Sequence, residues 1–115
     1  VGASLETLIS LGVERVLTSG GEATVLEGMD TLAHLVQQAG DRIIVMPGCG
    51  ITTRNFERLH RNIGAKEYHV FLPQEAASRM AWRPSHIYMG GMLRQAEFSI
   101  VRTDPAQLQT ILEAR

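Results

Sequence analysis

A carboxylate and an imidazole stand two residues apart in the strand-sized segment Glu67-Tyr68-His69-Val70-Phe71. Successive side chains of a strand point to opposite faces, so Glu67 and His69 are predicted to share one face. Charge inside a packed sheet is costly unless it is paired or serves a site. Two interpretations stay open. The two groups act as a catalytic acid and base, with His69 also able to bind a metal, or they lie at a solvent edge or form a structural pair.

The single cysteine, Cys49, lies between two glycines directly after an apolar run. A thiolate is a soft ligand that suits Cu(I) or Zn(II), and thioether sulfur also suits Cu(I). The methionines that could assist are Met46, Met80, Met89 and Met92. The alternative is a lone, partly buried thiol with methionines used for packing, since no second cysteine completes a metal motif.

Two glycine-rich turns follow apolar runs: Ser19-Gly20-Gly21 and Gly48-Cys49-Gly50. Each lies where a strand is predicted to end and a helix to begin. Glycine leaves backbone amides uncovered, and a helix N-terminus adds partial positive charge, so the turns together predict a pocket for an anion such as phosphate. The alternative is that the glycines only make tight turns.

The elements that position these residues alternate between strand and helix. Strands are predicted over 15–18, 43–46 and 67–71. Helices are expected from Ser4 to Gly12, from a capping box at Thr24 to Gly40, from Thr52 or Thr53 to Gly64, and from Asp104 onward. His34 and His60 fall on helices and are expected to face solvent.

This alternation predicts an α/β fold with a parallel sheet covered on both faces. It fits a doubly wound sheet or an eight-stranded barrel, and no G-x-G-x-x-G motif favours the first. Residues 72–96 do not follow this alternation of strand and helix. They are predicted to form a long loop with a short helix over 75–81.

Composition narrows the class of protein. The chain has 115 residues, 44% of them apolar and 20% charged, with a net charge of −1. Nothing predicts nucleic-acid binding, a membrane span or a secretory leader. One cysteine fits a reducing compartment. The chain opens on Val1 almost directly into a helix, so we expect it to be a piece of a longer protein.

Several blocks of the sequence resemble the CutC family of copper homeostasis proteins. They are Leu11 to Gly21, Leu26-Glu27-Gly28, Arg42 to Ile51, Lys66 to His69, Trp82-Arg83, Met89-Gly90 and Glu97-Phe98-Ser99. The resemblance implies a (β/α)8 TIM-type barrel, of which residues 1–115 would be the C-terminal portion, about three terminal βα units without the N-terminal strands. It also implies a cytoplasmic protein linked to copper.

The resemblance places the family's site residues at the barrel mouth: Thr18, Ser19, Gly20, Gly21, Pro47, Gly48, Gly50, Glu67 and His69. Two positions depart from the family. Cys49 replaces a usual glycine, which adds a soft ligand or narrows an anion pocket. Val70-Phe71-Leu72 replaces small residues beside the pocket.

Three functional hypotheses follow. The first is copper homeostasis with Cu(I) bound by Cys49 and His69. The second is a barrel enzyme acting on a small anionic molecule, with Glu67 and His69 as acid and base. The third is a fragment inactive alone, because a barrel needs roughly 250 residues. An open part-barrel would expose strand edges and apolar faces, so a homo-oligomer is expected.

Overall fold

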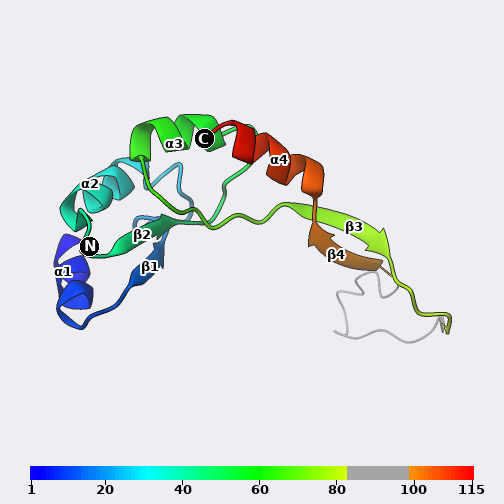
Figure 1. Ribbon diagram of the computed structural model, residues 1–115, viewed down its shortest axis with the longest axis horizontal. Coiled ribbons are helices and arrows are strands. Elements are labelled where there is room, and N and C mark those ends of the chain that lie inside the picture. The colour runs from blue at the N-terminus through cyan, green and yellow to red at the C-terminus, as the bar shows by residue number, and fades with distance from the viewer. Residues whose placement is uncertain (83–98) are drawn as a thin grey trace.

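The computed structural model describes residues 1–82 and 99–115 (Figure 1). In these two segments the order of elements is α1 (Gly2–Ser10), β1 (Arg15–Thr18), α2 (Met29–Ala39), β2 (Ile44–Pro47), α3 (Phe56–Ile63), β3 (Pro73–Ala77), β4 (Ser99–Thr103) and α4 (Pro105–Glu113). The α/β class is therefore confirmed. Met89 and Met92 fall outside the described residues.

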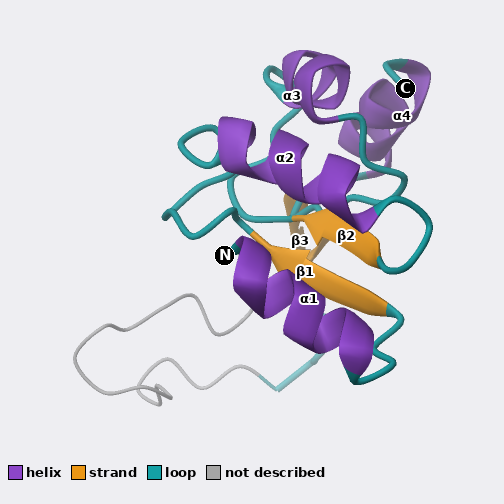
Figure 2. Ribbon diagram, turned by 90° about the vertical axis from the view of Figure 1, so that its left-hand side faces the viewer, coloured by secondary structure: helices purple, strands orange, loops and turns teal. Residues whose placement is uncertain are grey.

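Strands β1 and β2 form the parallel pair that the sequence predicts, with Arg15 opposite Ile44 and Thr18 opposite Pro47. Side chains alternate along both strands. Val45 and Pro47 are buried, whereas Leu17 on the other face is 51% exposed. The helices cover one face only, and α2 lies over the strands in Figure 2. The expectation of two covered faces is wrong for the residues described here.

The buried residues form two clusters on the helical side of the sheet. One joins α1, α2 and β2 through Leu5, Leu35, Ala39, Ile43 and Val45. The other joins α2, α3 and α4, and α3 lies between the other two helices in Figure 1. Its buried members are Val25, Leu32, Ile51, Phe56, Leu59, Ile63, Ala65, Leu72 and Ile111.

Two expected elements are absent from the described residues. The segment 67–71 is no regular strand: it pairs with Gly48 through a single parallel bridge at His69, because β2 is its one neighbour in the described structure. The helix expected over 75–81 is also wrong. Residues Pro73–Ala77 form β3, which pairs antiparallel with the β-branched segment of β4.

The hairpin of β3 and β4 extends away from the helices (Figure 1). The radius of gyration is accordingly 18.4 Å, against about 13 Å for a compact domain of this length. Within the described segments, no helix is long and apolar enough to cross a membrane.

Candidate functional site at the strand ends

The carboxyl ends of β1 and β2 bring together several of the predicted site residues. The Gly48 amide donates a hydrogen bond to the carbonyl of Thr18 at 3.1 Å. The His69 amide donates to the carbonyl of Pro47 at 2.9 Å. These bonds extend the parallel ladder by one step, so Thr18, Pro47, Gly48 and His69 lie at one end of the sheet.

The first glycine turn is folded against the start of α2. The Gly20 amide donates to the Thr18 hydroxyl at 3.0 Å, and the Ser19 hydroxyl donates to the Glu22 carbonyl. Gly20 has a φ of +81°, and a Cβ there would lie 2.7 Å from the carbonyl oxygen of Gly28. The Gly20 and Gly48 amides thus already have partners, so an anion bound here would use other donors of the turns, which include Gly21 and Gly50.

The second glycine turn leans on the segment that precedes α2. The Val25 amide donates to the Cys49 carbonyl at 3.0 Å, and the Cys49 thiol donates to the Ala23 carbonyl at 3.2 Å. Cys49 is exposed, and it is the one non-glycine residue with positive φ, +90°, among the described residues. An L-residue rarely adopts this conformation, so the backbone here is strained.

Replacing Cys49 with glycine is expected to stabilise the chain by about 1 kcal/mol. Relief of a positive φ is worth about 1–2 kcal/mol, and the extra freedom of glycine in the unfolded chain offsets about 0.4–1 kcal/mol of it. Thermal unfolding followed by circular dichroism would measure the change. Cys49→Ala is the matched control, since it removes the thiol and keeps the strained Cβ. A gain in both variants would contradict the backbone explanation.

Gly48 allows two side chains to close over the strand end. A Cβ at Gly48 would lie 2.5 Å from Leu17 Cδ1 and 2.9 Å from His69 Cβ. His69 is exposed and sits on the uncovered side of the sheet beside Leu17. His69 and Cys49 therefore flank one residue, but their side chains have different neighbours.

Glu67 pairs with Arg15, a residue that the sequence reasoning missed. The Arg15 guanidinium donates from two nitrogens to the two carboxylate oxygens of Glu67, each at 3.1 Å. The hydrogen bonds from Arg15 hold the pKa of Glu67 below its usual value, so the carboxylate is ionised at neutral pH. Arg15 lies two residues before Leu17 in the predicted strand, so their side chains point to the same face of the sheet. Glu67 points to that face as well once the strands are in register, and this shared face could have identified Arg15 as its partner.

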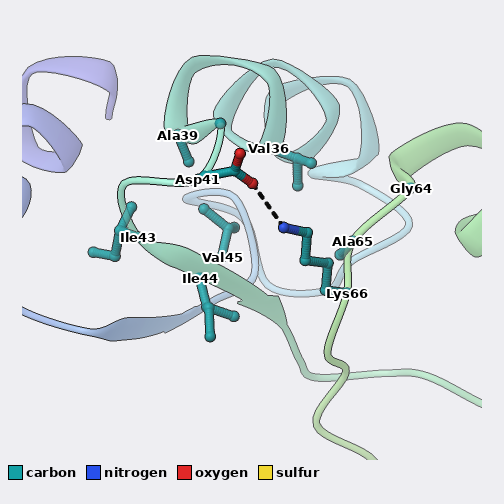
Figure 3. A pocket seen from close by; sticks show the side chains of 10 residues that line it. Val36, Ala39, Asp41, Ile43, Ile44, Val45, Gly64, Ala65 and Lys66 are labelled. Carbon is teal, nitrogen blue, oxygen red and sulfur yellow. Dashed lines mark hydrogen bonds and ion pairs between the residues drawn. The ribbon is translucent and has the colours of Figure 1, made fainter.

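Two of the hollows in the described structure lie at opposite ends of β2. The larger, about 380 Å³, runs between α4, Phe56 of α3 and the segment 66–70, and both Met46 and Glu67 line it. The smaller, about 70 Å³, lies at the opposite end of β2, where Asp41 and Lys66 form an ion pair at 2.9 Å (Figure 3). The smaller hollow thus lies away from the carboxyl ends of the strands, where the predicted site residues gather.

The candidate metal ligands do not gather into a full set. No group of three or more His, Cys, Asp or Glu side chains suited to a metal occurs in the part of the chain that the structure describes. Cys49 and His69 both adjoin Gly48 at the strand ends, while Met80 lies three residues beyond the end of β3. Of the methionines in question, Met46 shares the uncovered sheet side with Glu67.

The two helical histidines differ. His34 is exposed, as expected. His60 is half-buried, so its expected exposure is wrong: its Nδ1 lies 2.8 Å from the Tyr68 hydroxyl and its ring stacks on Phe56. Burial raises the pKa of Tyr68, whose hydroxyl also accepts a hydrogen bond from the Ala65 amide. His60 belongs to the core rather than to the strand ends.

Comparison with known proteins gives one consistent result. The sequence model of the CutC family matches residues 1–72. The human copper homeostasis protein cutC homolog is 44% identical over 95% of this chain and 40% of its own length. A CutC family protein from Parabacteroides distasonis is 37% identical over 95% of this chain and 45% of its own length.

A solved structure agrees with these sequences. The crystal structure of a CutC protein from Streptococcus agalactiae matches with a TM-score of 0.50 and 29% identity, covering 59% of this chain and 33% of that one. The chain thus spans less than half the length of these relatives.

Proposed function

The chain belongs to the CutC family, and from this we propose that the protein works in copper homeostasis, with Cys49 and His69 as Cu(I) ligands. The names of the relatives support the copper assignment. The observation that carries the ligand assignment is the position of both residues beside Gly48, where the strands end.

The fold proposal that accompanies this function is a partial (β/α)8 barrel. Residues 1–115 would supply about three terminal βα units, built on 15–18, 44–47 and 67–71. The parallel pairing of the first two and the bridge at His69 support this order. The uncovered sheet side, with Leu17, Met46 and Glu67, would then face the barrel interior. The activity would belong to the whole protein, and this chain alone would be incomplete.

The donor chemistry suits copper in its reduced state. An exposed thiol can deprotonate and bind a soft cation, and imidazole is also a copper ligand. Met46 lies on the same side of the sheet as His69 and could add a thioether ligand. We also propose a cytoplasmic location, which an exposed free thiol supports because it suits a reducing compartment.

Cu(I) titration under anaerobic, reducing conditions, with a coloured Cu(I) chelator as competitor, tests the ligands. We expect Cys49→Ser and His69→Ala each to weaken Cu(I) binding at least tenfold. His34→Ala is the control, because His34 is exposed on α2, outside the strand ends. Parent-like affinity in Cys49→Ser, or no binding by the parent chain, would overturn the assignment of ligands to this chain.

The second candidate is a barrel enzyme for a small anionic molecule. The Arg15–Glu67 pair beside a hollow of about 380 Å³ favours it. Glu67, held ionised, could act as a base or orient a cationic group, and His69 could donate the proton. The anion would lie at the turns formed by Thr18, Ser19, Gly20, Gly21, Pro47, Gly48 and Gly50. Amide resonances of Gly21 and Gly50 that shift on addition of inorganic phosphate would favour this candidate.

We also propose that the chain self-associates. One side of the β1–β2 sheet is uncovered, and the hairpin of β3 and β4 stands apart from the helices (Figure 1). Both features expose apolar side chains, which include Leu17, Ile100 and Val101.

A further inference from the structure

The hairpin of β3 and β4 lacks a core of its own. Its ten residues include none that is buried, and Ile100 and Val101 are 51% and 63% exposed. An isolated two-stranded hairpin is marginally stable in water. Each strand also has an outer edge without a strand partner in the described structure, and such edges pair readily with another chain.

The register shows which backbone groups each outer edge presents. The Asp104 amide donates to the Leu72 carbonyl at 2.7 Å, and these two residues are opposite each other, one step beyond the Pro73–Thr103 pair. Hydrogen-bonded and non-hydrogen-bonded pairs alternate in an antiparallel ladder. Backbone groups therefore point outward from β4 at Ser99, Val101 and Thr103, and from β3 at Pro73, Glu75 and Ala77.

The edge of β3 is poorly suited to pairing. Pro73 has no N–H to donate outward. If two copies of β3 met about a two-fold axis at Glu75, the two carboxylates would lie directly opposite each other, which is destabilising.

The edge of β4 carries neither obstacle. All of its outward residues have an N–H, and its sequence Ser-Ile-Val-Arg-Thr is rich in β-branched residues. In an antiparallel pairing centred on Val101, Arg102 of one copy would lie opposite Ile100 of the other. The arginines are then not opposite each other, and each guanidinium keeps its hydrogen bond to Gln74 of its own β3 at 3.2 Å.

We propose that β4 pairs antiparallel with β4 of a second copy about a two-fold axis at Val101. The two hairpins then form one four-stranded sheet. Val101 exchanges hydrogen bonds with Val101 of the other copy, and Ser99 with Thr103. This inference rests on the proposed self-association and names its surface; it is independent of copper.

Sedimentation equilibrium of the full 115-residue chain over a range of concentrations tests it. We expect the parent to dimerise and Val101→Pro to raise the dimer dissociation constant at least tenfold. The lost N–H points outward, so the β3–β4 ladder stays intact. Val101→Lys, which places two like charges opposite each other, should have the same effect without a proline. Ala77→Pro is the matched control: it removes an outward N–H from β3 and should leave the dimer unchanged.

The possible outcomes test two claims separately: that the chain self-associates, and that it does so through β4. A parent that stays monomeric would overturn both. A parent dimer that persists in Val101→Pro and Val101→Lys, or that Ala77→Pro dissociates, would overturn the β4 surface alone. Growth beyond dimers would also contradict it, because a two-fold contact closes on itself. Circular dichroism of each variant checks that the fold is retained.

Discussion

Replacing Phe56 with alanine is expected to lower the free energy of unfolding by about 3–5 kcal/mol, the usual cost of emptying a phenylalanine site in a core. Phe56 is 2% exposed and lies in the cluster that joins α2, α3 and α4. Its ring stacks on His60 at 5.7 Å and meets the edge of Tyr68 at 5.0 Å. Small domains are stable by only about 5–15 kcal/mol, so the melting temperature should fall by roughly 12 °C or more.

The chain offers a matched control in Phe71, which is 70% exposed. Phe71→Ala removes the same atoms from a site in water, so its effect should stay within about 0.5 kcal/mol. Thermal and urea unfolding of both variants would measure the difference. Equal losses would show that Phe71 is covered in solution, for example by a second copy, and concentration dependence of its melting would reveal that.

Much of the fold could be predicted because its signals are local. The apolar stripe of α2 predicts its buried face, and Leu32 and Ala39 are buried as expected. The Asp104-Pro105 pair predicts the start of α4, and the Asp104 carboxylate accepts from the Ala106 amide at 2.9 Å. The parallel pairing of β1 and β2 follows from their apolar runs and the helix between them.

The predictions that failed depended on distant partners. The capping box at Thr24 forms only in part. The Thr24 hydroxyl accepts from the Glu27 amide at 3.4 Å, but the Glu27 carboxylate accepts from the Thr24 hydroxyl, at 3.1 Å, and not from a backbone amide. The helix nevertheless begins at Met29, after a turn that packs on the Ser19–Gly20 loop. The β3 strand was missed because five residues without clear alternation show no periodicity until β4 lies beside them.

The candidate site also combines features that local sequence predicts with features that depend on residues far apart in the chain. The shared face of Glu67 and His69 follows from spacing alone. The pairing of Glu67 with Arg15 does not, because the two residues are 52 positions apart and meet only when β1, β2 and the segment 66–70 are in register. The positive φ of Cys49 is likewise a property of the folded turn.

Gly28→Ala is the second substitution expected to have a large effect, because it would force apart the β1 loop and the start of α2. A Cβ at Gly28 would lie 2.0 Å from the carbonyl oxygen of Ser19. Its φ is −90°, which any residue can adopt, so the need for glycine is purely one of space. The obstacle is backbone, which cannot rotate aside as a side chain can. We expect a loss of about 3 kcal/mol, at the upper end for overpacking.

Gly64→Ala separates this steric cost from a conformational one. Gly64 has a φ of +68°, and nothing lies within 4 Å of a Cβ placed there. Its substitution costs the left-handed backbone, about 1–2 kcal/mol, and the smaller freedom of alanine in the unfolded chain offsets about 0.4–1 kcal/mol of it. Urea unfolding should therefore rank Gly28→Ala as the more damaging variant. If the ranking were reversed, the contact between Gly28 and Ser19 would be looser in solution, and the first glycine turn would be free to rearrange around a ligand.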